Sequence, residues 1–357
     1  MKRLYFQRYL KLTIGAVFAI PLVSLANAAC QVNPNEISVG PAPTDSANQA
    51  DCRTIQHEAG ETEICGQPQR IVVLGPFVLE PLLALGIQPS AYAAHTDWHQ
   101  GDYDNPSQQI PYLGEYVTHP LMNVGSAPQP SIEVLLQMQP DLILGTNFNN
   151  ADEYEMLAQI APTVLLQWDD AETNVRTIAQ AVSSPEKAEQ VLSARAQQVA
   201  DAQSRFAAFV ADYPNILLFS TNSELQHFSM GNSAHGLCSS LLIDLGFNLV
   251  SIPGLRDNQP GAAVPISLET LTQADDTDAI IVIGVREDQP SEKEEHRDHQ
   301  LTELKRAWEE NAIAQSLDAS KAGRVYFIPA YMCLGLPGPI GTELYLEELK
   351  ATLLPPN

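Results

Sequence analysis

The sequence predicts an α/β protein of two lobes, each a parallel sheet flanked by helices, joined by one long interlobe helix. Three observations predict this architecture. Apolar runs alternate with helical segments along most of the chain, which is typical of parallel sheets covered on both faces. Residues 183–211 keep a helical period over a length that suits a strut between two lobes. Finally, one helix-strand segment occurs twice, at 130–145 and at 265–284.

Two segments precede the predicted fold. Residues 1–28 have a basic start, an apolar run and a small-residue cleavage site, which are the features of a secretory signal peptide. Residues 29–51 are rich in Pro, Asn, Ser and Ala, so we expect a flexible tether. Cys30 would allow a lipid anchor, but Asn27 stands where a lipobox has an aliphatic residue. We therefore expect a soluble exported protein and favour the lipid anchor less.

The N-terminal lobe is expected over residues 52–182. Its strands should be apolar runs that end at Gly or Pro, and its helices should lie between them. The predicted strands are 70–75, 88–94, 110–115, 141–145 and 162–168, and the predicted helices are 78–87, 131–138 and 151–161.

The connecting helix is expected over residues 183–212, and the C-terminal lobe over 213–357. The helix has no Gly, has Pro only in its first turn, and is rich in good helix formers. Since a helix of this length resists bending, we expect small lobe motion. The predicted strands of the second lobe are 215–221, 279–284 and 324–330, and its predicted helices are 236–246, 267–274, 301–317 and 341–354.

Charge and cysteine content narrow the class of protein. The formal net charge is −24, so nucleic acid is a poor partner. Export to an oxidising compartment favours disulfides among the five cysteines. Cys52 could pair with Cys65 across a hairpin, and Cys238 could pair with Cys333, but the sequence leaves both pairings open.

The repeated segment places a glutamate in the same position of both lobes. Ser131 and Ser267 are expected as N-caps, which puts Glu133 and Glu269 in the first turn of their helices. A carboxylate there is favoured by the helix dipole, and this alone would account for both residues.

A family resemblance gives the two glutamates a second interpretation. The segments 70–93, 123–145, 268–283 and 322–349, with the long helix between them, resemble periplasmic substrate-binding proteins of ABC importers for ferric siderophores and cobalamin. The lead-in at 52–70 resembles the siderophore-binding members in particular. The resemblance implies that Glu133 and Glu269 dock onto arginines of the permease dimer in the inner membrane. It also implies capture of a ferric siderophore, with iron carried inside that complex and no cofactor held by the protein. We expect the protein to act as a monomer.

The ligand should lie beyond the carboxyl ends of the strands, where two facing lobes form a cleft. Arg286 is the strongest candidate, because its guanidinium can hold carboxylate or hydroxamate oxygens in a bidentate manner. The competing interpretation is a loop arginine paired with Glu287 or Asp288. The other candidates in these loops are Phe77, Trp98, Trp168, Met230, Asn232 and Tyr331.

Three alternatives stay open. The same fold could bind cobalamin or heme instead. Direct metal binding is disfavoured, because His95 and His99 lie in a turn-rich segment and we interpret the charged run with His296 and His299 as a solvated face. An exported α/β hydrolase is disfavoured as well, because the segment 231–236 around Ser233 only nearly matches a nucleophile elbow. We therefore expect a binding protein and not an enzyme.

Overall fold

The computed structural model describes residues 51–95, 99–168, 170–226, 228–230, 235–252, 264–274, 276–286 and 296–354. The predicted signal peptide, and all of the predicted tether except Asp51, lie outside these residues. The chain divides into two units, Met1–Asn48 and Gln49–Asn357, and every described residue belongs to the second unit. Among the described residues, no helix combines the length and the apolar character needed to cross a membrane.

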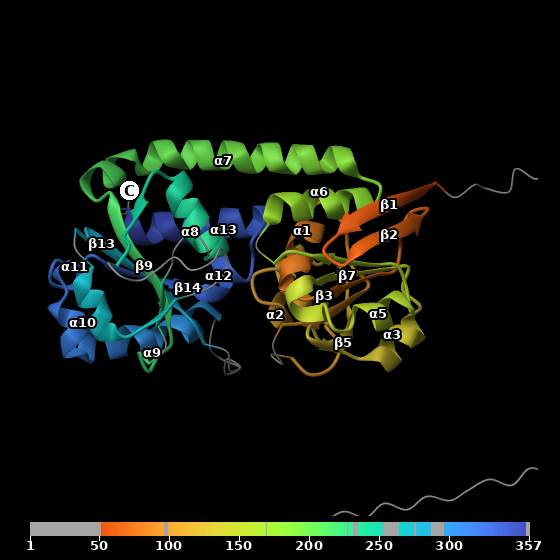
Figure 1. The fold of residues 1–357 in the computed structure, drawn as a ribbon, viewed down its shortest axis with the longest axis horizontal. Helices are drawn as coiled ribbons and strands as arrows, with labels where there is room; N and C mark the ends of the chain where they lie inside the picture. Colours follow the sequence, from red (N-terminus) through yellow and green to blue (C-terminus); the bar gives the residue numbers. More distant parts are fainter. Residues whose placement is uncertain are drawn as a thin grey trace, which may run out of the picture. The chain divides into compact units, whose positions relative to one another are not determined.

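The N-terminal lobe contains a six-stranded sheet in which only the edge strand is antiparallel to its neighbour (Figure 1). The order is β6 (Gln129–Pro130), β5 (Met122–Ser126), β4 (Ala91–Ala94), β3 (Ile71–Leu74), β7 (Leu142–Thr146) and β8 (Thr163–Leu166). Its helices are α1 (Pro76–Ala84), α2 (Pro106–Gln109), α3 (Ile132–Met138), α4 (Asn147–Asn150), α5 (Tyr154–Ala158) and α6 (Ala171–Ala181), with a 3-10 turn at Gly114–Tyr116.

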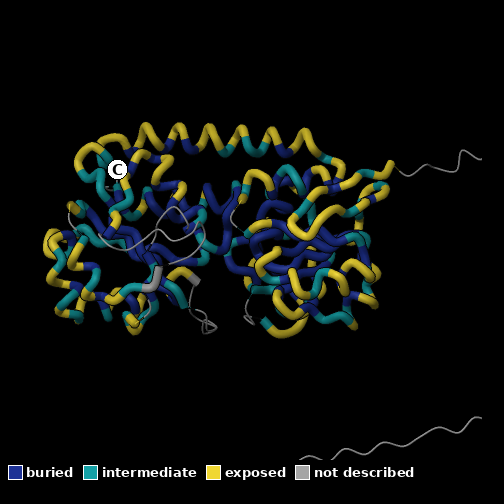
Figure 2. The backbone as a smooth tube through the Cα atoms, viewed as in Figure 1, coloured by how far each residue is buried: buried dark blue, intermediate teal, exposed yellow. Residues whose placement is uncertain are grey.

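Both faces of this sheet are covered because successive side chains of a strand point to opposite sides. On β3, Ile71 and Val73 belong to the apolar cluster that includes α1 and α6. Val72 and Leu74 belong to the cluster that includes α3 and α5. The alternation explains why the strands read as continuous apolar runs. Figure 2 shows them as the buried centre of the lobe.

The C-terminal lobe repeats this construction. Its sheet has the order β12 (Val264–Ile266), β10 (Phe228–Met230), β9 (Asn215–Thr221), β13 (Ala279–Gly284) and β14 (Val325–Pro329), and β11 (Asn248–Leu249) also pairs with β9. Strands β9, β13 and β14 are parallel. The remaining elements are α8 (Gly236–Asp244), the 3-10 helix η2 (Leu268–Gln273), α9 (His296–Glu310), α10 (Ala312–Ser316), α11 (Asp318–Lys321), α12 (Ala330–Leu334) and α13 (Pro339–Leu353).

One long helix, α7 (Pro185–Asp212), runs between the two lobes and contacts α6 and α13 (Figure 1). Its 28 residues span about 40 Å at 1.5 Å per residue. Only four of its residues are buried, and Figure 2 shows most of the helix as exposed. The predicted fold class, two α/β lobes with a long interlobe helix, is confirmed.

A buried glutamate joins the lobes beneath α7. Glu80 of α1 reaches the start of α13, where its Oε1 accepts hydrogen bonds from the Ile340 N–H at 2.5 Å and the Gly341 N–H at 3.4 Å. Any side chain at position 338 would displace this carboxylate, since a Cβ would fall 1.8 Å from Glu80 Oε2. Burial raises the pKa of Glu80 to about 7, although the hydrogen bonds act in the opposite direction. No local pattern in the sequence predicts this contact, because its partners are 260 residues apart.

Three predicted elements differ from the structure. Residues 110–115 are not a strand but a turn followed by a 3-10 helix, and β5 takes the place of the third strand. The predicted α-helix at 267–274 is the 3-10 helix η2, and Ser267 makes no capping hydrogen bond. The predicted helix at 301–317 is divided at Asn311, whose side chain caps α10 instead. By contrast, the expected N-cap at Ser131 is confirmed, because its Oγ accepts from the Val134 N–H at 3.4 Å.

Both cysteine pairs considered in the sequence form disulfides. Cys52–Cys65 closes the antiparallel hairpin of β1 (Cys52–His57) and β2 (Gly60–Cys65), in which these two residues lie directly opposite each other. Cys238–Cys333 joins α8 to α12 inside the core of the second lobe. The only cluster of three potential metal ligands among the described residues is Cys52, Glu63 and Cys65, and its two sulfurs are already bonded to each other.

Candidate ligand-binding site

Aromatic side chains gather at the carboxyl ends of the strands in the N-terminal lobe. Phe77 lies in the first turn of α1, directly after β3, where the positive φ of Gly75 lets the chain turn. Its ring packs edge-on against His95, with centroids 5.4 Å apart, and against Trp168, 6.3 Å apart. Phe77 is buried, whereas Trp168 and His95 are partly exposed. Two predicted ligand residues, Phe77 and Trp168, are therefore neighbours.

The second lobe meets this aromatic group at Gly236, the first residue of α8. A Cβ on Gly236 would lie 3.3 Å from the ring of Trp168, and the φ of Gly236 is positive. The residue before it, His235, is buried, with Nε2 3.3 Å from Ser220 Oγ, and burial lowers its pKa to about 4. Trp168 therefore stands at the boundary between the lobes, where a ligand held by both would lie.

A second aromatic group crosses between the lobes. Tyr331, at the start of α12, stacks on Tyr112 with centroids 5.8 Å apart and an interplanar angle of 25°. Tyr331 also hydrogen bonds to the Tyr92 side chain, and Tyr92 packs against Tyr103 at 5.2 Å. Burial raises the pKa of Tyr331 well above its usual range. Tyr331 is half-buried as a residue, so it is part of the contact between the lobes and keeps some exposed surface.

Arg286 follows the carboxyl end of β13 by two residues, as predicted. Its Nη1 lies 3.7 Å from Glu303 Oε2 and donates to the His299 carbonyl oxygen at 3.4 Å. Both partners belong to α9, so the arginine is held along that helix. Glu287 and Asp288, the partners considered in the sequence, lie outside the described residues. The side chain is 24% exposed, so part of it remains accessible.

The remaining candidates are placed differently or not described. Met230 is 5% exposed and packs in the apolar cluster around Phe219 and Trp308, so the structure does not bring it to the aromatic residues. Trp98, Asn232 and Ser233 lie outside the described residues.

Sequence reasoning also missed a charge pair near the junction. Arg297 of α9 donates to the Glu348 carboxylate of α13 through Nη2 at 2.7 Å and through Nε at 3.1 Å. Burial raises the pKa of the nearby Tyr112 hydroxyl; the charge of Glu348 raises it further, and the charge of Arg297 lowers it. The charged run that contains Arg297 is predicted from the sequence to be a solvated face. That interpretation is wrong for His299, which is 2% exposed. The local sequence around a polar residue that helix packing buries can be the same as around one that faces solvent. The sequence therefore does not distinguish the two cases.

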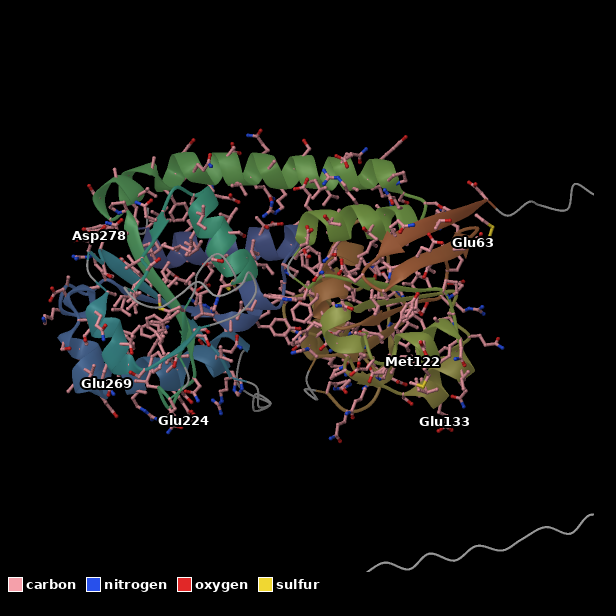
Figure 3. The ribbon with its side chains drawn as sticks, viewed as in Figure 1. Glu63, Met122, Glu133, Glu224, Glu269 and Asp278 are labelled. Atoms are coloured by element: carbon pink, nitrogen blue, oxygen red, sulfur yellow. A yellow bond between two sulfur atoms is a disulfide. The ribbon has the colours of Figure 1, made fainter. Side chains whose placement is uncertain are left out.

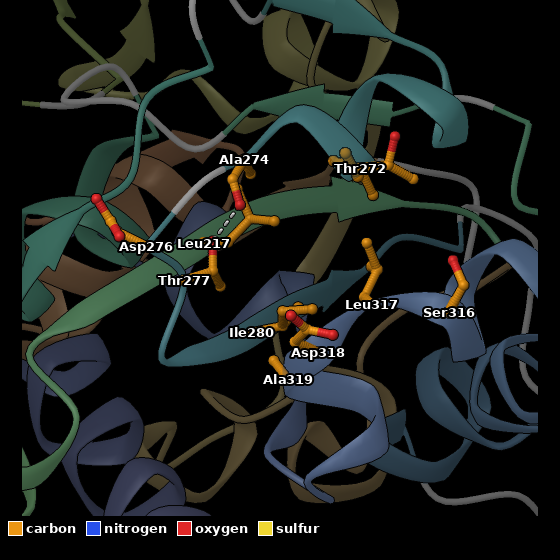
Figure 4. Close-up of a pocket in the computed structure, with 11 residues that line it drawn as sticks. Leu217, Thr272, Ala274, Asp276, Thr277, Ile280, Ser316, Leu317, Asp318 and Ala319 are labelled. Carbon is orange, nitrogen blue, oxygen red and sulfur yellow. Dashed lines mark hydrogen bonds between the residues drawn. The ribbon is translucent and has the colours of Figure 1, made fainter.

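The repeated glutamates are both exposed. Glu133 lies in the first turn of α3, and Glu269 lies in η2. Figure 3 shows their side chains on the side turned away from α7, one on each lobe. A cavity of about 490 Å³ lies near Glu269, between η2, the amino ends of β9 and β13, and α11 (Figure 4). It is at the opposite ends of the strands from Phe77, Trp168 and Arg286, so it is not the ligand site predicted by the strand rule.

The fold and this site define a two-lobed substrate-binding protein. Residues 71–332 match the model of the periplasmic binding protein family, and the chain belongs to that family. Because these proteins bind their substrates without converting them, the expectation that the chain is not an enzyme is confirmed.

Known proteins similar to this chain are of the same kind. The putative ABC transporter substrate-binding lipoprotein YhfQ of Bacillus subtilis is 25% identical over 349 residues, which cover 94% of this chain and 96% of that protein. The Fe(3+)-citrate-binding protein YfmC of Bacillus subtilis is 25% identical over 319 residues, or 88% of each chain. The crystal structure of Staphylococcus aureus SirA complexed with staphyloferrin B has a TM-score of 0.64 and 20% identity, and the match covers 84% of this chain and 97% of that one.

Proposed function

We propose that this protein captures a ferric siderophore in the periplasm, between its two lobes, and delivers it to an ABC permease dimer in the inner membrane. The observation that carries the proposal is the aromatic group of Phe77, His95 and Trp168, which meets the second lobe at Gly236. The rings of Trp168 and His95 each have a polar edge, which suits a half-hydrated ligand. Both lobes contribute residues around this position. The relatives that bind ferric citrate or serve ABC transporters support the same function.

In this proposal the protein holds no cofactor of its own, and iron arrives already wrapped by its chelator. Arg286, Tyr331, Phe77 and Trp168 are the described residues that we propose to contact the complex. Trp98, Met230 and Asn232 stay predictions, and so do the domain boundaries. We also propose that the protein acts as a monomer.

The test is a titration of the mature protein, followed by tryptophan fluorescence, with ferric hydroxamate, citrate and catecholate siderophores, cobalamin and heme. We expect saturable quenching by a ferric complex and none by its iron-free form. Trp168→Phe should remove much of the signal, whereas Trp308→Phe should retain it, because Trp308 is buried against Phe219 in the core of the second lobe. A response to cobalamin or heme alone would show that the ligand is not a ferric siderophore. No response to any of these compounds would contradict the proposal.

The two exposed glutamates give a separate prediction about delivery. In the proposed docking, each carboxylate meets a basic pocket of one permease subunit. Glu133→Ala and Glu269→Ala should each lower uptake of the ferric complex by at least about tenfold in cells, while the purified variants bind it normally. The matched control is Glu155→Ala, which removes an exposed carboxylate from the first turn of α5. Normal uptake by a variant that combines Glu133→Ala with Glu269→Ala would contradict the docking role.

A further inference from the structure

The N-terminal lobe offers the ligand no cationic Lys or Arg side chain. Residues 52–182 contain sixteen acidic residues and only three basic ones, Arg53, Arg70 and Arg176. Arg53 donates to main-chain carbonyls at Gly66, Gln180 and Ala181, beside the hairpin. Arg70 is exposed at the amino end of β3, which is the end away from the site. Arg176 is paired with two glutamates on α6 and α7, its Nε 2.8 Å from Glu189 Oε1.

In the second lobe, each described arginine near the site already has a carboxylate. Arg286 is paired with Glu303, and Arg297 with Glu348. The carboxyl end of β9 adds Glu224, which is exposed and accepts from Asn222 Nδ2 at 2.7 Å. The described part of the site therefore has no excess of positive charge.

Resting on the proposed function, we infer that the ferric complex taken by this protein has no net negative charge and is a neutral or cationic ferric trishydroxamate. A ferric ion bound by three hydroxamates is neutral, and a pendant amine makes the complex cationic, whereas a triscatecholate complex carries three negative charges. Placing a trianion among compensated arginines and additional carboxylates is electrostatically unfavourable. The aromatic group of Phe77, His95 and Trp168 places no charge requirement on the complex.

The first test compares four ferric complexes on the mature protein by the same fluorescence titration. They are a neutral trishydroxamate, a trishydroxamate with a pendant amine, a triscatecholate and ferric citrate. We expect the neutral and cationic complexes to bind at least about 100-fold more tightly than the triscatecholate or the citrate complex. Equal or tighter binding of either anionic complex would overturn the inference and leave the proposed function intact. Binding of no ferric complex would overturn both.

The second test removes a compensating carboxylate. Glu303→Gln removes the negative charge 3.7 Å from Arg286 Nη1, so the ratio of triscatecholate to trishydroxamate affinity should rise by about tenfold. The matched control is Glu310→Gln, an exposed residue two turns along α9, which should leave the ratio unchanged. A ratio that stays the same in Glu303→Gln would contradict the role assigned to charge compensation. A thermal melt of each variant shows whether it is folded.

Discussion

Removing the disulfide between Cys238 and Cys333 should lower the free energy of unfolding by about 4.7 kcal/mol. The bond closes a loop with a sequence separation of 95 residues, so its loss restores much conformational freedom to the unfolded chain. It also ties α8, which begins at Gly236 beside Trp168, to α12, which begins beside Tyr331. Urea unfolding of the Cys238→Ala/Cys333→Ala variant, compared with the oxidised wild type, measures the effect.

The hairpin disulfide provides the matched control. Cys52 and Cys65 are separated by 13 residues, and their bond should contribute about 3 kcal/mol by the same reasoning. Its loss should leave ligand affinity unchanged, because neither cysteine is near the site. A larger loss of stability from the hairpin pair than from Cys238–Cys333 would contradict the argument from loop length.

The stability that Glu80 contributes should depend on pH. Burial raises its pKa from 4.5 to about 7, so between these values the folded state holds a proton that the unfolded chain has released. The contribution is full below about pH 4.5 and is lost as the pH rises through about 7. Relative to Glu80→Gln, the free energy of unfolding of the wild type should therefore fall by about 3 kcal/mol over this range.

Urea unfolding at pH 4.5, 6 and 7.5 measures this difference. Glu343→Gln is the control, since Glu343 lies on the same helix, α13, but is exposed, and it should track the wild type at every pH. If the difference between wild type and Glu80→Gln is the same at all three pH values, the carboxyl group does not titrate in the way its burial requires.

Much of the fold follows from local sequence, because periodicity and turn residues decide which segments become strands and helices. The errors lie where a local signal was ambiguous. Residues 110–115 have the composition of a short strand, but Tyr112 has a φ of 59°, which no strand adopts. In η2, Ser267 makes a hydrogen bond with the Thr270 side chain at 3.0 Å, so it does not cap the helix.

The site was less predictable because its residues meet through packing. The rule that ligands lie beyond the carboxyl ends of strands selected two residues, Phe77 and Trp168, that are neighbours in the structure. It could not identify Glu80, whose partners are 260 residues away. Nor could it pair Arg286 with Glu303, since that contact depends on how α9 lies along the sheet. Contacts of this kind are set by tertiary structure and leave no periodic signal.

The exposure of α7 has a consequence for the evolution of the chain. Most of its 28 positions face solvent, so substitutions there should accumulate freely among relatives. Its length is another matter, since inserting one residue would rotate everything beyond it by about 100° and shift it by about 1.5 Å. Such a change would separate Arg195 from Thr342, which its Nε contacts at 2.9 Å. Across homologous genes, this helix should drift in sequence while insertions and deletions are eliminated.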